Sequence, residues 1–216
     1  MSVERVLIVL GGTDIPLDTI RRWSEEATHI YAADGAANRL FENGITPSAI
    51  VGDMDSIDVR WRTAAVGWLE ISDQESTDCD KVLGVVRERP PQTSAWVVGL
   101  EGDRLDHVLA NLQSLVKSGM DLRLVLRDGI GTFVLADRNA SVQTIPGQVV
   151  SIIPVTECSG VVTSGLKWTP NSALSPTGAL SISNVAEGTG VDISLASGHA
   201  LVLLQTDSSM PRWDGS

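Results

Sequence analysis

The chain has 216 residues, of which 43% are hydrophobic and 20% are charged. This apolar fraction suffices for a buried core and excludes a disordered chain, and the length suits one large domain or two small ones. Lys and Arg number 16 against 27 Asp and Glu, which gives a formal net charge of -11. So acidic a chain lacks the basic surface that binds a phosphate backbone, and we expect no nucleic-acid partner. It suits a cationic small molecule, or an anion whose charge a metal masks.

The two cysteines, Cys79 and Cys158, lie far apart and form no paired motif. We therefore expect neither a disulfide framework nor a cysteine zinc site, and a reduced compartment fits. The apolar run before Gly11 is too short for a signal peptide, and no stretch approaches the roughly 20 apolar residues of a membrane span. The sequence predicts a cytoplasmic protein that does not bind membranes.

The first two-thirds of the chain alternates short apolar runs with segments of helical periodicity. We expect strands over 6–10, 30–33, 49–51, 68–71, 96–99 and 122–126. We expect helices over 17–27, 36–43, 59–65, 77–88 and 105–117, the last with a Leu and Val stripe that predicts a core-facing helix. Several strands are continuously apolar, as in sheets covered on both faces. The alternation predicts an α/β domain with a mainly parallel, Rossmann-like sheet.

After about residue 136 the composition shifts to Ser, Thr, Gly and Pro, and helical periodicity ends. Short strand-like runs recur over 149–155, 160–163, 179–183, 191–195 and 200–205. This spacing predicts a small antiparallel all-β sandwich or barrel, of which we take the sandwich as the expectation. We place the boundary at Asp137, with an α/β domain over 1–137 and the β domain over 138–216.

Aspartates recur where a predicted strand ends and a helix begins. The residues in these junctions are Asp34, Asp53, Asp55, Asp73, Asp78 and Asp106. In a parallel sheet with right-handed crossovers such junctions share one edge, which is the usual ligand crevice. Each aspartate taken singly has a second explanation as a helix cap. Clustered carboxylates, however, repel one another unless a cation binds, and Mg²⁺ that bridges phosphates suits oxygen ligands.

Positive charge is scarce near these junctions. Lys81 follows Asp78 by one helical turn, and Arg104 precedes Asp106 in a glycine-containing loop, so both are candidates to reach a phosphate. The alternatives are a solvated Lys81 that pairs with Asp78, and a surface position for Arg104. No Walker A motif is present, so nucleotide binding would use another loop architecture.

Five segments resemble the thiamine pyrophosphokinase family in order and spacing. They are DGAANRL (34–40), GDMDSI (52–57), DQESTDCDK (73–81), GLEGDRLDH (99–107), and the C-terminal pair GLKW (165–168) with LSISN (180–184). The resemblance implies an N-terminal α/β domain and a C-terminal β-sandwich in a homodimer with active sites between subunits. It implies transfer of the pyrophosphoryl group of ATP to the hydroxyl of thiamine, with Mg²⁺, giving thiamine diphosphate and AMP.

The resemblance also assigns roles to residues. Catalytic carboxylates would be Asp53, Asp55, Asp78 and Asp106, of which the first three would hold Mg²⁺. The phosphates would contact Thr77, Lys81 and Arg104. Thiamine would contact Asp34, Asn38 and Gln74 of one subunit and Trp168, Ser181, Ser183 and Asn184 of the other. Apart from the resemblance, the chemistry favours a carboxylate that takes the proton of the thiamine hydroxyl, and the candidates are Asp78 and Asp53.

This sequence departs from the family pattern at three positions: Asp103 replaces a frequent glycine, and Pro170 and Pro176 fall near the thiamine pocket. Trp168 suits the thiazolium cation, with a core aromatic as the alternative. Two other functions remain open at this point. One is pyrophosphoryl transfer to a different hydroxymethyl acceptor such as a pterin, and the other is a non-catalytic sensor of nucleotide or thiamine.

Overall fold

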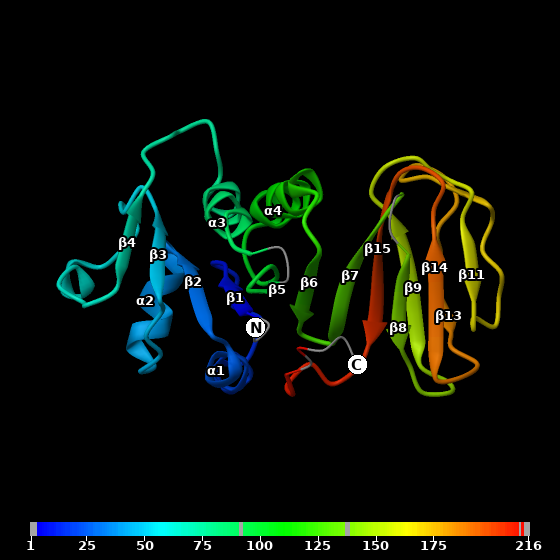
Figure 1. The fold of residues 1–216 in the computed structure, drawn as a ribbon, viewed down its shortest axis with the longest axis horizontal. Helices are drawn as coiled ribbons and strands as arrows, with labels where there is room; N and C mark the ends of the chain where they lie inside the picture. The colour runs from blue at the N-terminus through cyan, green and yellow to red at the C-terminus, as the bar shows by residue number, and fades with distance from the viewer. Residues whose placement is uncertain (1–3, 91–92, 137–138, 212, 214–216) are drawn as a thin grey trace. The chain divides into compact units, whose positions relative to one another are not determined.

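The computed structural model describes residues 4–90, 93–136, 139–211 and 213. The chain forms two compact units, which Figure 1 labels by element. Unit 1 runs to Arg127 and includes Ser208–Pro211, and unit 2 covers Asp128–Asp207. The boundary expected at Asp137 lies outside the described residues.

Unit 1 contains the six expected strands. They are β1 (Arg5–Val9), β2 (His29–Ala33), β3 (Ala49–Gly52), β4 (Gly67–Glu70), β5 (Ser94–Val98) and β6 (Leu122–Leu126). Their order is β6-β5-β1-β2-β3-β4, and every neighbouring pair is parallel. The large sheet as a whole is nevertheless mixed, because it also contains antiparallel strands, so the expected mainly parallel, Rossmann-like sheet is not confirmed.

Four helices connect these strands: α1 (Leu17–Glu26), α2 (Asp34–Glu42), α3 (Asp78–Arg87) and α4 (Leu105–Ser118). In Figure 1, α3 and α4 lie side by side on one side of the strands of this unit. Helix α2 begins directly after β2, and helix α3 begins after the loop that follows β4. Because β2, β3 and β4 are parallel, the first residues of both helices lie at the same edge of the sheet. None of the helices in the described part of the chain has the length and apolar character of a membrane span.

Two helix predictions were wrong in part. The segment expected to be helical over 59–65 forms only a short 3₁₀ turn, η1 (Val59–Trp61). Val59 is 76% exposed, so this segment has no buried apolar stripe to stabilise a longer helix. The stripe of α4 is not core-facing along its whole length: Leu115 is buried, but Leu105 and Leu109 are exposed.

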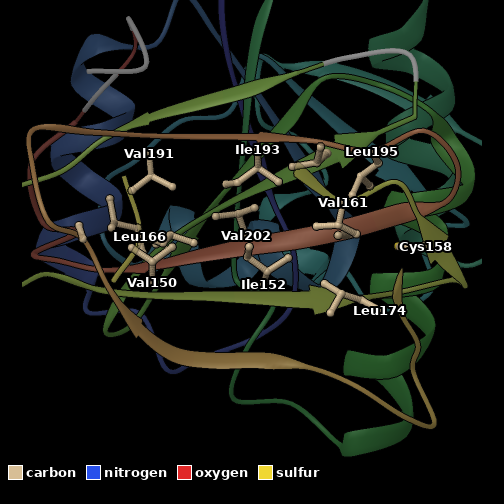
Figure 2. Packing of buried hydrophobic residues seen from close by; sticks show 14 residues of the cluster. Val150, Ile152, Cys158, Val161, Leu166, Leu174, Val191, Ile193, Leu195 and Val202 are labelled. Carbon is tan, nitrogen blue, oxygen red and sulfur yellow. The ribbon is translucent and has the colours of Figure 1, made fainter. Parts of the chain in front are cut away.

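Unit 2 is β-rich. One group of antiparallel strands has the order β13 (Ser181–Val185), β9 (Val149–Pro154), β15 (His199–Gln205), β7 (Gly129–Leu135). A second sheet has the order β11 (Val162–Ser164), β14 (Gly190–Ser194), β8 (Ala140–Gln143), and a two-stranded ribbon pairs β10 (Cys158–Ser159) with β12 (Ala173–Leu174). Figure 2 shows that side chains of both sheets, such as Ile152 and Val202 from one and Val191 and Ile193 from the other, share one core.

Candidate active site

A cavity of about 320 Å³ lies in unit 1 at the carboxyl ends of its strands. Its polar lining comes from three loops and from the first turns of α3 and α4. The charged and polar side chains in that lining include those of Asp53, Asp73, Gln74, Asp78, Lys81 and His107. The position is the one expected from the strand–helix junctions of the sequence.

Three aspartates gather beside this cavity. One carboxylate oxygen from each of Asp34, Asp53 and Asp55 lies within 4.8 Å of the other two. Asp34 is fully buried, and its two oxygens accept hydrogen bonds from the amides of Gly35 at 2.7 Å and Ser56 at 3.4 Å. Burial, followed by the negative charge of Asp78, raises the pKa of Asp34 above its ordinary value. A cation at this position would relieve both effects.

Asp53 connects the aspartate cluster to the rest of the cavity. Its Oδ1 accepts a hydrogen bond from the Asp55 amide, which is the main cause of its lowered pKa. Its Oδ2 accepts a hydrogen bond from Gln74 Nε2 at 3.3 Å and lies 3.8 Å from Lys81 Nζ. Thus Gln74, expected from the resemblance to contact thiamine, lines the cavity in contact with a carboxylate of the aspartate cluster.

Lys81 pairs with Asp78 as the alternative expected, but its side chain is only 4% exposed, so the expectation that it is solvated is wrong. Its Nζ lies 3.3 Å from Asp78 Oδ1 as well as 3.8 Å from Asp53 Oδ2. One ammonium group therefore joins a carboxylate of the β3 loop to one at the start of α3. Asp78 is not in the 4.8 Å group of described aspartates, and it joins that group through Lys81.

The first turn of α3 is fixed by a capping box. Thr77 Oγ1 accepts a hydrogen bond from the Asp80 amide at 3.1 Å, and Asp80 Oδ2 accepts one from the Thr77 amide at 3.1 Å. This arrangement sets the position of Asp78 as the first residue of the helix. Thr77 lines the cavity, but its hydroxyl is already used in the cap. Cys79, the next residue of α3, also lines the cavity but is almost fully buried, and burial raises the pKa of its thiol to about 12.

Asn38 holds the loop that carries Asp53 and Asp55. Its Nδ2 donates to the carbonyl of Ser56 at 2.8 Å, and its Oδ1 accepts from the amide of Asp58 at 2.8 Å. The side chain is absent from the cavity lining of the described residues, although the resemblance assigned it to thiamine. The sequence gives no sign of this clamp, because it depends on α2 packing beside the loop.

The loop before α4 contributes different residues from those expected. Arg104 and Asp106 form an exposed two-point ion pair, Nε–Oδ1 at 3.1 Å and Nη2–Oδ2 at 2.6 Å, and this pairing lowers the pKa of Asp106. Neither is part of the cavity lining of the described chain. Asp103 and His107 do line it, with Asp103 Oδ2 at 2.9 Å from His107 Nδ1. Asp103 is thus a departure from the family pattern that lies at the cavity, and His107 lines the cavity although no pattern in the sequence predicts it there.

Unit 2 has a separate cavity of about 340 Å³ whose lining includes Trp168, Pro170, Ser181 and Asn184. Trp168 is 52% exposed, so the alternative that it is a core aromatic is wrong. Buried Asn184 accepts from the Trp168 amide at 3.1 Å and donates to its carbonyl at 2.6 Å, which fixes the backbone below the ring.

Lys167 and Ser183 are next to lining residues of this cavity in the sequence. Lys167 places its Nζ 4.7 Å from the centre of the Trp168 ring, a cation–π contact within the chain. Ser183 adopts a left-handed backbone with φ of 55°, where the register of β13 against β9 shifts. Its side chain is outside the lining formed by the described residues.

Two models of known protein families match this sequence. Residues 20–126 match the family model for the catalytic domain of thiamin pyrophosphokinase. Residues 137–199 match the family model for the vitamin B1 binding domain of thiamin pyrophosphokinase. The chain belongs to the thiamin pyrophosphokinase family. The two matched regions contain the unit 1 site and most of unit 2, respectively.

Named relatives of the family agree with this result. The chain is 28% identical over 193 residues to thiamine pyrophosphokinase 1 of Oryza sativa subsp. japonica, covering 75% of this chain and 73% of that one. It is 26% identical over 223 residues to thiamine pyrophosphokinase of Bacillus subtilis (strain 168), covering 95% and 100%. The fold is similar to the crystal structure of thiamin pyrophosphokinase from Geobacillus thermodenitrificans, with a TM-score of 0.78 at 24% identity over 96% and 100% of the two chains.

Proposed function

We propose that this chain transfers the pyrophosphoryl group of ATP to the hydroxyl of thiamine, giving thiamine diphosphate and AMP. Membership of the family supports an ATP-dependent pyrophosphotransferase. The observation that carries the proposal is the grouping of Asp34, Asp53 and Asp55 beside a cavity that also holds Asp78 and Lys81. Phosphoryl-type transfer depends mainly on positioning and charge neutralisation, and this is an arrangement of charges that can provide both.

The donor set fits Mg²⁺. Carboxylate oxygens are the ligands this hard cation prefers, and zinc would favour nitrogen or sulfur. Those of Asp53 and Asp55 lie within 4.8 Å of each other and of buried Asp34. Asp53 and Asp55 would hold the ion together with Asp78, which shares Lys81 with Asp53, and Asp34 would add negative charge behind it. Bound Mg²⁺ would draw charge off the phosphates of ATP during transfer.

The remaining groups of the unit 1 site would act on the two substrates. Lys81, Thr77 and Arg104 would contact phosphate oxygens. For this role the Thr77 hydroxyl has to leave Asp80, and the Arg104–Asp106 ion pair has to open. Asp53 or Asp78 would accept the proton of the thiamine hydroxyl, and Asp106 would assist catalysis after releasing Arg104. Gln74 and Asp34 would orient thiamine. Asn38 would contribute by holding the loop that carries Asp53 and Asp55.

The thiamine ring system would bind at the unit 2 cavity. An aromatic face attracts a cation, so the exposed ring of Trp168 suits the positively charged thiazolium. Ser181, Ser183 and Asn184 would provide polar contacts around it. We further propose that residues 1–137 form the ATP- and Mg²⁺-binding domain, Rossmann-like and mainly parallel, and that residues 138–216 form the thiamine-binding β-sandwich. The buried, unpaired thiols of Cys79 and Cys158 support a reducing, cytoplasmic location.

We propose a homodimer in which each active site combines the unit 1 cavity of one subunit with the unit 2 cavity, which contains Trp168, of the other. Co-refolding Asp53→Asn with Trp168→Ala tests this arrangement. Mixed dimers would contain one intact site, and random mixing should restore roughly a quarter of wild-type activity. No recovery after subunit exchange, confirmed by native mass spectrometry, would place each site within one chain.

A turnover assay with alternative acceptors tests the activity. With ATP and Mg²⁺, AMP should be released in the presence of thiamine but not of a hydroxymethyl pterin. AMP release with the pterin alone would identify a different pyrophosphokinase. Binding of thiamine or nucleotide without turnover would identify a sensor.

A further inference from the structure

The ammonium group of Lys81 is the most deeply buried positive charge in the unit 1 site. Its side chain is 4% exposed, and its Nζ lies 3.3 Å from Asp78 and 3.8 Å from Asp53. A buried ammonium is costly unless it is paired, so these two carboxylates hold Lys81 in this position. The same ammonium offsets their mutual repulsion.

Asp53 and Asp78 are also the carboxylates to which the proposed function assigns the metal. Asp53 Oδ1 already accepts from the Asp55 amide, and its Oδ2 faces Gln74 and Lys81. A divalent cation bound to both carboxylates would therefore meet a fixed positive charge in direct contact with its ligands. Like charges this close repel strongly in a partly desolvated site, so the two cations compete.

We infer that Lys81 is the built-in counter-ion of the metal site and couples metal binding to nucleotide binding. Before the metal arrives, Lys81 holds Asp53 and Asp78 together across two loops. When the metal takes the carboxylates, the flexible Lys81 side chain turns into the cavity that it lines and contacts a phosphate oxygen of the nucleotide. This inference rests on the proposed function, and it makes Lys81 a positioning residue as well as a phosphate contact.

The inference predicts effects of opposite sign from a single substitution. Removing the charge of Lys81 removes the competitor of the metal, so the affinity for metal without nucleotide should rise. The same change removes a phosphate contact, so the affinity for nucleotide in the presence of metal should fall. A residue that acts only on phosphate would show the second effect without the first.

Calorimetric titration of Lys81→Met with MgCl₂, and then with the Mg²⁺ complex of a non-hydrolysable ATP analogue, separates these effects. We expect Mg²⁺ to bind at least about tenfold more tightly than to wild type, and the analogue at least about tenfold more weakly, each factor corresponding to 1.4 kcal/mol. Lys117→Met, which removes the same charge from an exposed position on α4, should change neither affinity. Unchanged or weaker Mg²⁺ binding by Lys81→Met would overturn the inference, and Lys81→Gln serves if the Met variant fails to fold.

A second measurement uses the unmodified chain. It contains three lysines, Lys81, Lys117 and Lys167, so ¹³Cε-lysine labelling gives an NMR spectrum of three resonances that Lys117→Met and Lys167→Met assign. We expect the Lys81 resonance to shift on addition of MgCl₂ and again on addition of the analogue, while that of Lys117 stays in place. If the chemical shift of the Lys81 resonance does not change on addition of Mg²⁺, under conditions where calorimetry shows that Mg²⁺ is bound, the inference is overturned. Wild-type protein that binds no Mg²⁺ even with the analogue would overturn the proposed function as well.

Discussion

Gly52 stands so close to Asp34 that a Cβ atom at position 52 would lie 2.8 Å from Asp34 Cγ. Gly52 is the last residue of β3 and directly precedes Asp53. Because it has no side chain, the buried carboxylate of Asp34 can lie against the loop that carries Asp53 and Asp55. The aspartate cluster thus depends on a glycine that offers no chemistry of its own.

Gly52→Ala should therefore displace Asp34 and disturb the cluster. We expect a loss of about 1–3 kcal/mol in the free energy of unfolding, as for other overpacked interiors, together with at least a tenfold loss of turnover. Gly84→Ala in α3 is the matched control, because a Cβ there meets nothing within 4 Å. It should gain roughly 0.5–1 kcal/mol from helix propensity and keep its activity. Denaturant titration measures both, and a Gly52→Ala protein as stable and active as wild type would contradict this packing argument.

Asp53→Asn and Asp55→Asn should each nearly abolish turnover while leaving the fold intact. Each change removes a charged oxygen ligand from the proposed Mg²⁺ site. Asp55→Asn also relieves carboxylate repulsion, so its stability without metal should be unchanged or higher. Asp53→Asn also removes one of the two charges that pair buried Lys81, so its stability without metal should be somewhat lower. Asp18→Asn, at an exposed position in the first turn of α1, provides the control. Steady-state kinetics at saturating Mg²⁺ decides the matter: activity within a few-fold of wild type in both site variants would exclude the metal role.

The raised pKa of Asp34 predicts a pH dependence with a defined sign. Burial and then the charge of Asp78 raise this pKa above 3.8, so the folded state binds the proton more tightly than the unfolded chain. The contribution of Asp34 to stability is therefore fully present below 3.8 and is lost as the pH rises through the raised pKa.

The test compares wild type with Asp34→Asn without metal. The difference in unfolding free energy, wild type minus variant, should fall as the pH rises from about 4 to about 7. Adding Mg²⁺ at the upper pH should restore part of the difference, since a bound cation favours the ionised carboxylate. Denaturant titrations at several pH values provide the data, and a difference that is constant or grows with pH would contradict the raised pKa of buried Asp34.

The sequence predicted the positions of the aspartates well, because strand ends and helix starts can be read from apolar periodicity. The six strands of unit 1 are found where expected, and Asp34, Asp53 and Asp55 converge as a shared sheet edge requires. The contacts that give each group its environment could not be predicted, because they join residues distant in the chain. Examples are the clamp of Asn38 on Ser56 and the burial of Lys81 between two loops.

Unit 2 was harder to predict for a related reason. Strands β7 and β8 carry mixed Gly, Thr, Ser and Gln residues, and their stability comes from pairing with the distant β15 and β14. The segment 59–65 shows the opposite case, in which a helical pattern in the sequence does not give a helix. Val59 stays exposed there, so no packing stabilises a helix longer than η1. The local sequence pattern was sufficient to predict elements that are continuously apolar. It was insufficient for elements whose formation depends on pairing with distant segments.

Trp168→Ala and Lys167→Met should change thiamine binding in opposite directions. Loss of the aromatic face removes a cation–π contact of typically ~0.5–2 kcal/mol, so the KM for thiamine should rise while that for ATP stays nearly constant. Lys167 holds its own cation 4.7 Å from the same ring, so removing that charge should lower the KM for thiamine a few-fold. Kinetics with each substrate varied in turn tests both, with circular dichroism as the control for folding. Equal effects of Trp168→Ala on both substrates would assign the ring a structural role.

The most direct measurement follows the γ-phosphorus of ATP through one turnover with thiamine and Mg²⁺. Transfer of the whole pyrophosphoryl group predicts that γ-labelled ATP yields labelled thiamine diphosphate and unlabelled AMP in equal amounts, and that Asp53→Asn yields neither. Formation of ADP, release of AMP without thiamine, or label that stays with the nucleotide would contradict the proposed reaction.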